Sequence, residues 1–300
     1  MRGPGKLIDL RHLGREKVIA SYLLDGPEPA LVDCGPSTCV DALEQGVAAN
    51  GSSLHDVRHL VLTHIHLDHA GAAGLLVRRY PHLRVHVSGV GAPHLVDPSR
   101  LERSARRLYG EDFDFLWGEL VPVPEENVDV IGDHVLDLEA WPTPGHASHH
   151  VSFLAPDGSC YSGDATGVVI APATYVAPVS PPPDIDLEAW EASIDSIEER
   201  EPERLCLPHW GVVDDAPTHL SRLRVQLRTW SERVRGGAAE EEFVTAATSD
   251  LAAASDERTA QAYLQAAPMW QSYAGLRRYW EKQGVLVTPD QGSSAGGSVP

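Results

Sequence analysis

The sequence has few cysteines and no long apolar run. Its four cysteines form no C-x-x-C pair, so the sequence indicates neither a disulfide framework nor a thiolate zinc motif; they are Cys34, Cys39, Cys160 and Cys206. The opening segment MRGPGKLIDLRHLG lacks the apolar stretch of a signal peptide. No segment approaches the roughly 18 apolar residues of a membrane helix. These absences predict a cytoplasmic globular protein with reduced cysteines and no membrane partner.

An excess of positive charge is also missing. The chain has 24 Lys and Arg against 43 Asp and Glu, which gives a formal net charge of −19. A field of that sign repels phosphate backbones, so the sequence predicts no nucleic-acid partner. A small-molecule substrate is the expected partner, and a homodimer stays open.

Short apolar runs and helical segments alternate along the 300 residues. Strands are predicted at 18–24, 30–33, 57–62, 83–88, 134–141, 150–155, 159–162 and 204–207. Helices are predicted at 38–49, 71–80, 99–109, 111–118, 187–199, 216–235 and 239–282. Two halves, each of strands followed by helices, favour two sheets packed face to face with helices outside.

Four potential metal ligands stand within the segment THIHLDHAG, directly after the apolar run 57–62: they are His64, His66, Asp68 and His69. Alternate residues of an extended segment point the same way, so His64 and His66 can face one ion. Asp68 and His69 fall where the chain turns, and can face a second ion. Imidazole and carboxylate without thiolate suit zinc, iron or manganese. A chance cluster of surface histidines is the alternative, and this spacing disfavours it.

Three more candidate ligands follow predicted strands further along the chain. His146 lies in TPGHASHH, Asp164 in SGDA and His209 in LPHWG. Each alone would be weak, because a lone histidine after a strand is usually an ordinary polar residue. All three share a position at a strand-to-loop junction, so together with the first four residues they make a set of seven candidate ligands.

These four motifs resemble the metallo-β-lactamase superfamily, which includes glyoxalase II, lactonases and many thioesterases. The resemblance covers residues 18–211. It implies an α+β fold, a four-layer αββα sandwich with the metal ions at one edge of the sheets. We therefore expect a catalytic domain at 1–211, a C-terminal helical extension at 212–290 and a flexible tail at 291–300.

The resemblance also implies a ligand set for two divalent ions, with Zn²⁺ expected and Fe or Mn as alternatives. One ion would be held by His64, His66 and His146, and the second by Asp68, His69 and His209. Asp164 would bridge the two.

Asp33 in LVDCG matches an early aspartate of the superfamily, which implies that it supports the metal-binding loop without ligating. His149 and His150 are expected to be structural neighbours of the ligands. The remaining histidines are expected in solvent or in turns: His12, His55, His59, His82, His86, His94, His134 and His219.

The expected activity is hydrolysis of an ester, thioester or lactone by a metal-bound hydroxide, since zinc lowers the pKa of a bound water to about 7. Asp68, besides ligating, would pass a proton to the leaving group. His209, where some β-lactamases have cysteine, favours the glyoxalase II side of the superfamily. Gly167 stands where lactonases often carry tyrosine, which speaks against a lactonase.

Other functions stay open beside hydrolysis. Persulfide dioxygenases of the superfamily use one iron in the same ligand shell. The net charge disfavours a phosphodiesterase or nuclease, and the complete ligand set disfavours a non-catalytic binding module.

The substrate pocket is expected at the Arg-rich segment 100–109 and at the Pro-rich loop 171–184. Tyr175 and Trp210 are more simply explained by ordinary packing. Arg277, Arg278 and Lys282 alone are weak evidence for a glutathione site.

Overall fold

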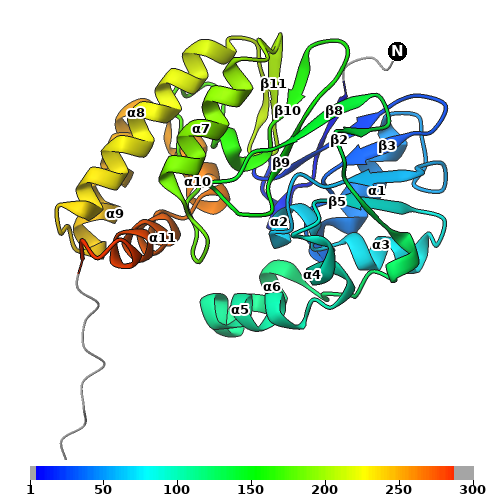
Figure 1. The fold of residues 1–300 in the computed structure, drawn as a ribbon, viewed down its shortest axis with the longest axis horizontal. Coiled ribbons are helices and arrows are strands. Elements are labelled where there is room, and N and C mark those ends of the chain that lie inside the picture. Colours follow the sequence, from blue (N-terminus) through cyan, green and yellow to red (C-terminus); the bar gives the residue numbers. More distant parts are fainter. Residues whose placement is uncertain (1–4, 287–300) are drawn as a thin grey trace, which may run out of the picture.

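The computed structural model describes residues 5–286, which form two six-stranded sheets packed face to face (Figure 1). In spatial order the first sheet contains β1 (Lys6–Asp9), β2 (Ala20–Leu24), β3 (Ala30–Val32), β4 (His59–Val61), β5 (Arg84–Val87) and β6 (Val128–Val130). The second contains β12 (Gly211–Val213), β11 (Arg204–Leu207), β10 (Ser159–Tyr161), β9 (Val151–Leu154), β8 (Leu138–Pro142) and β7 (His134–Val135). The expected tail at 291–300 lies outside the described residues.

Apolar side chains between the two sheets hold them together. Tyr22, Val32 and Val61 from the first sheet pack in one buried cluster with Val151 and Phe153 from the second. The period-2 alternation of a strand turns the next residues of β2 and β3 to the opposite face, where helices cover them. The sheets therefore share an apolar interior, and each also needs a helical layer outside.

Helices form the two outer layers. The helices between the strands of the first sheet are α1 (Val40–Ala49), α2 (Leu67–Ala70), α3 (Ala73–Arg79), α4 (Ala92–Val96), α5 (Ser99–Tyr109) and α6 (Phe113–Trp117). Those that follow β10 are α7 (Leu187–Glu198), α8 (Ala216–Arg235), α9 (Glu240–Ala254), α10 (Glu257–Ala266) and α11 (Met269–Lys282). Helices α1 and α3 cover the first sheet, and α7 and α8 cover the second (Figure 1). The predicted α+β sandwich with C-terminal helices is confirmed.

The C-terminal helices pack onto the sandwich. Trp230, Phe243 and Tyr263 belong to the same buried cluster as Leu31 and Leu60 of the first sheet. The Tyr263 hydroxyl donates to the carbonyl of Tyr175 at 2.6 Å and accepts from the Ile170 N–H at 2.8 Å, so α10 is fastened to the loop after β10. Within residues 5–286 no helix is long and apolar enough to cross a membrane.

Several elements differ from the sequence prediction. The predicted helix 239–282 is three helices, α9, α10 and α11. The first break follows from Asp256, whose carboxylate accepts from the Thr259 N–H at 2.9 Å and starts α10 as an N-cap. The predicted strand 134–141 is divided into β7 and β8 by Leu136, whose φ of 57° is incompatible with an extended strand. Strands β1, β6 and β12 and helix α4 were not predicted.

Candidate metal centre

All seven predicted ligands lie at one edge of the two sheets, because each follows the end of a strand. His64 and His66 follow β4, and Asp68 and His69 lie in α2, the next element. The others come from the second sheet: His146 in the loop from β8 to β9, Asp164 in the short 3-10 helix Gly163–Thr166 after β10, and His209 between β11 and β12.

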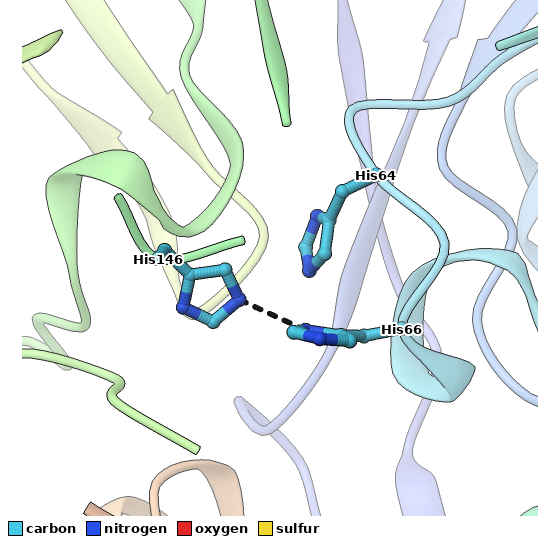
Figure 2. A group of neighbouring side chains, drawn as sticks. All are labelled: His64, His66 and His146. Carbon is cyan, nitrogen blue, oxygen red and sulfur yellow. Dashed lines mark hydrogen bonds between the residues drawn. The ribbon is translucent and has the colours of Figure 1, made fainter. Parts of the chain in front are cut away.

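The first group consists of His64, His66 and His146, whose imidazoles point toward one another (Figure 2). One nitrogen from each ring lies within 4.8 Å of those of the others. His146 Nε2 and His66 Nδ1 are 2.9 Å apart. Three imidazole nitrogens this close can hold one divalent cation.

The second group consists of Asp68, His69 and His209, whose ligand atoms also lie within 4.8 Å of one another. Asp68 Oδ2 is 3.3 Å from His209 Nε2 and 3.7 Å from His69 Nε2. This second set, two imidazoles and a carboxylate, also suits a divalent cation.

Asp164 lies between the two groups, and its two oxygens face different ones. Oδ2 is 3.5 Å from His146 Nε2 of the first group. Oδ1 is 3.4 Å from His69 Nε2 and 3.6 Å from His209 Nε2 of the second. One carboxylate therefore reaches both groups at once.

Four ligand atoms here are buried without a hydrogen-bond partner within the described part of the chain: His64 Nε2, His69 Nε2, Asp164 Oδ1 and His209 Nε2. Buried polar atoms are almost always paired, so a concentration of orphans at one place calls for a missing partner. Cations between these atoms would satisfy all four. The residues therefore fit a pair of divalent ions.

In three of the rings the other nitrogen is fixed by a hydrogen bond. The Nδ1 atoms of His146 and His209 each lie 2.6 Å from a backbone carbonyl, those of Val179 and Val18 respectively. His69 Nδ1 lies 2.9 Å from Asp33 Oδ2. Such partners set the ring orientation and leave Nε2 free for a metal.

Asp33 ties the β3 and β4 loops together. Its Oδ1 accepts from the Thr63 N–H at 2.8 Å, and its Oδ2 accepts from Thr63 Oγ1 at 2.8 Å as well as from His69. Its φ of 56° places it in the left-handed region, which aspartate tolerates better than most residues. Asp33 thus touches the ligand loop without reaching the centre.

His150 supports Asp164 from behind. Its Nε2 accepts from the Asp164 N–H at 3.1 Å, so the proton of the neutral ring is on Nδ1, which donates to Thr143 Oγ1 at 2.8 Å. His149 has a ring 5.3 Å from that of His66 and lines the open side of the centre.

The electrostatic pattern favours a bound cation. Burial, with the neighbouring imidazoles, holds the pKa values of His64 and His66 well below the usual range, so both rings are neutral, the form that binds metal. Burial alone would raise the pKa of Asp164, but the imidazoles of His69 and His209 hold it well below its ordinary value. Against the effect of burial, Asp164 and Asp68 raise the pKa values of His69 and His209, so these two rings lose a proton when a metal binds, whereas His64 and His66 are already neutral.

A cavity of about 820 Å³ opens onto the centre. Residues of the segment 100–109 line it, together with Pro181–Asp184 of the Pro-rich loop and residues of α10 and α11, so both segments expected to form the substrate pocket border this cavity. Tyr175 and Trp210 are absent from its wall; both pack against the buried cluster of the first sheet.

Two histidines expected in solvent or turns are buried instead. His12 is 3% exposed; its Nε2 donates to the Leu116 carbonyl at 2.9 Å and its ring stacks on Trp117. His219 is equally buried, and its Nε2 donates to the Thr166 carbonyl at 2.7 Å. The prediction was wrong for both, because their partners come from segments distant in sequence. His12 also lines the cavity.

Comparison with known proteins agrees with this geometry. The family model described as the metallo-beta-lactamase superfamily matches residues 14–209. A metallo-beta-lactamase fold-containing protein of Sulfurisphaera tokodaii, ST1585, is 29% identical over 198 residues, covering 61% of this chain and 72% of the relative. The N-acyl homoserine lactonase AttM of Agrobacterium fabrum is 33% identical over 126 residues, covering 39% of this chain and 41% of the lactonase.

Solved structures show the same fold. The crystal structure of ST1585 has a TM-score of 0.62 at 21% identity, with coverage of 87% of this chain and 93% of that one. A metallo-beta-lactamase family protein of Thermus thermophilus, TTHA1429, has a TM-score of 0.61 at 23% identity, with 89% of each chain covered. With a family model that spans the sandwich from residue 14 to His209, the chain belongs to the metallo-beta-lactamase superfamily.

Proposed function

We propose that the protein is a binuclear metal-dependent hydrolase that cleaves an ester or thioester, with a lactone as the less favoured substrate. The observation that carries the proposal is the position of Asp164. Its oxygens face His146 on one side and His69 with His209 on the other. A carboxylate so placed is suited to bridge two ions.

In this proposal His64, His66 and His146 hold one ion, and Asp68, His69 and His209 hold the other. When bound, such ions supply Lewis acidity and make a water acidic enough to ionise near pH 7. The chain's own part is to fix the ligand rings through their second nitrogens and to exclude solvent. Asp68 adds a proton-transfer role, because its side chain is 21% exposed and lines the cavity.

The environment of Gly167 supports an ester or thioester over a lactone. A Cβ at Gly167 would meet the Ala177 carbonyl oxygen at 2.7 Å, and its φ is 70°. A tyrosine therefore cannot occupy this position without moving the backbone, and a lactonase of the tyrosine-bearing type is disfavoured. The similarity to the lactonase AttM, which covers 39% of this chain, keeps lactones among the substrates to test.

The proposal also covers the partners and the location of the protein. We propose a small-molecule substrate, no nucleic-acid partner and a cytoplasmic location. The net charge of −19 supports the first two, because it repels phosphate backbones. The second ligand group provides a place for a second ion, and the number of bound ions distinguishes this proposal from a persulfide dioxygenase with a single iron.

The test combines metal analysis with a substrate panel. Protein purified without added metal is analysed for zinc, iron and manganese by mass spectrometry. It is then assayed on thioesters, esters, lactones, phosphodiesters and a persulfide, before and after chelation. We expect close to two divalent ions per chain and thioester or ester hydrolysis that chelation abolishes and zinc restores. One iron per chain with oxygen uptake on the persulfide, or full activity after complete chelation, would refute the proposal.

A further inference from the structure

The cavity beside the metal centre has two helical walls. Helix α5 forms one wall and α11, with the residues just before it, contributes to the other. They are joined across the cavity by Gln271, whose Nε2 donates to the Tyr109 hydroxyl at 3.3 Å. The loop Pro181–Asp184 completes the enclosure. The cavity is therefore built by segments that lie outside the sheets.

Three arginines line this cavity without an ion-pair partner. Arg100 and Arg107 come from α5, and Arg278 comes from α11. Within residues 5–286 no carboxylate forms an ion pair with any of them. Their neighbours behave differently: Arg106 pairs with Glu102 and Asp114 on the outer side of α5, and Arg277 pairs with Glu281.

Unpaired arginines at one cavity are unexpected in so acidic a chain. Acidic residues outnumber basic ones by 43 to 24, so carboxylate partners are plentiful. Besides the candidate ligands Asp68 and Asp164, two carboxylates line the same cavity, Asp112 and Asp184. Asp184 accepts from Ser148 Oγ at 3.3 Å, and neither Asp112 nor Asp184 pairs with these arginines. Arg107 Nε donates to the backbone carbonyl of Arg103 at 3.4 Å, and the other N–H groups of all three guanidinium groups remain for an anion, for which their planar fork is well suited.

The remainder of the wall is apolar. Leu101, Leu108 and Trp117 line the α5 side, and Trp270 lines the α11 side. Trp270 is 37% exposed, a large exposure for an aromatic side chain. A ligand with an apolar part would cover it and bury that surface.

We propose that the substrate is an amphipathic acyl compound whose anionic oxygen group, a carboxylate or a phosphate, is bound by Arg100, Arg107 and Arg278. Its apolar part lies against Trp117 and Trp270, and its carbonyl reaches the metal centre. This inference rests on the proposed function for the position of the carbonyl. The anion site itself depends only on the three arginines.

The experiment uses matched probes that differ only in charge. The hydrolysable pair is the thioester S-octanoyl-3-mercaptopropionate and its uncharged primary amide. The stable ligands are 3-(octylthio)propanoate, its amide and 2-(octylthio)ethyl phosphate, whose binding to the metal-loaded protein is measured by calorimetry. The carboxylate and phosphate arms distinguish the two sources of the anion.

The variant is the triple change Arg100→Gln, Arg107→Gln and Arg278→Gln. The matched control is Arg103→Gln, an exposed arginine of α5 that does not line the cavity. Hydrogen bonds between charged groups are stronger than those between neutral groups. We therefore expect the wild-type protein to bind an anionic probe at least about tenfold more tightly than the amide. The triple variant should lose this preference, raise KM for the anionic thioester at unchanged kcat, and leave the amide unaffected.

Several results would overturn the anion site. These are equal affinity of wild-type protein for charged and uncharged probes, an unchanged preference in the triple variant, an equal loss for both probes, or the same loss in Arg103→Gln. If the stable anionic ligands bind through the arginines but no thioester, ester or lactone is hydrolysed, the proposed function fails while the anion site stands. If hydrolysis proceeds without any preference for the charged probe, the proposed function stands and the anion site fails.

Discussion

Asp164 shows how much the centre depends on single atoms. It is buried in the 3-10 helix that follows β10, and its backbone N–H donates to His150. With the backbone fixed in this way, its two oxygens face different imidazole groups. A bridging carboxylate must also carry charge, because it offsets the mutual repulsion of two cations.

The substitution Asp164→Asn tests this role at almost constant volume. The amide keeps the shape but loses the charge, so it bridges two cations poorly. We expect weaker binding of one ion and a fall in kcat of about 10² or more, measured by metal titration and steady-state kinetics. The exposed Asp133→Asn is the control and should change neither. If Asp164→Asn retains two ions and normal turnover, Asp164 is not the bridge.

Asp33 should act on the metal through His69. Asparagine tolerates the left-handed backbone that Asp33 adopts, so Asp33→Asn removes charge without adding strain. The variant loses the anionic acceptor for His69 Nδ1–H. Loss of such a partner costs about 10- to 100-fold in metal affinity.

That loss is measured by competition with a chromophoric chelator. Kinetics at saturating metal provide the discriminating readout: kcat should largely recover in Asp33→Asn, since Asp33 positions a ligand and touches no reacting atom. A kcat that stays low with both ions bound would contradict this role.

At the residue scale, the sequence predicts the metal ligands better than the groups that orient them by hydrogen bonds. The ligand types are chemically restricted, and their spacing in THIHLDHAG is distinctive. The carbonyls of Val18 and Val179, which orient His209 and His146, carry no such signal, because any residue has a carbonyl. His12 was missed for a related reason: its partner Leu116 is distant in sequence.

At the element scale, the long and strongly patterned segments were predictable and the short ones were not. Strand β11 and helices α5 and α8 have the predicted bounds. Strands β1 and β12 have four and three residues, too few for a periodic pattern, and exist because a neighbouring strand pairs with them. The partition of α9–α11 depends on caps that a helical periodicity does not reveal.

Gly275 sets how closely α11 approaches the Pro-rich loop. A Cβ at this position would meet the Ser180 carbonyl oxygen at 2.0 Å. Ser180 follows Val179, whose carbonyl orients His146. The packing of a C-terminal helix is therefore connected to the position of a candidate ligand.

We expect Gly275→Ala to lower the free energy of unfolding, although alanine favours a helix interior by about 1 kcal/mol. Overpacking against backbone commonly costs about 1–3 kcal/mol, and the displaced loop should also weaken metal binding. Denaturant titration and metal titration measure the two effects. Gly132→Ala, where a Cβ meets nothing within 4 Å, is the control. A Gly275→Ala protein as stable as the control would show that the loop yields freely.

At the scale of the whole molecule, the histidines link stability to pH. His219 on α8 holds the 3-10 helix Gly163–Thr166 through the Thr166 carbonyl, and so joins a C-terminal helix to the segment that carries Asp164. Burial lowers its pKa from 6.5 to about 4, and the hydrogen bond to Thr166 opposes this only in part. His219 is therefore neutral in the folded protein at pH values where it is already protonated in the unfolded chain.

The sign of the pH effect follows from proton counting. Between pH 6.5 and about 4 the unfolded chain binds more protons at His219 than the folded protein, so stability rises with pH in this window and falls on acidification. Between pH 7.5 and pH 5 the loss of folding free energy from this residue is about 2 kcal/mol.

The variant His219→Gln tests this effect, because glutamine keeps a donor for the Thr166 carbonyl and does not titrate. Because the other buried histidines titrate in both proteins, the difference between their stability curves isolates His219. In denaturant titrations across this range, the variant should lose about 2 kcal/mol less than the wild type, and parallel curves would mean that His219 is protonated alike in both states.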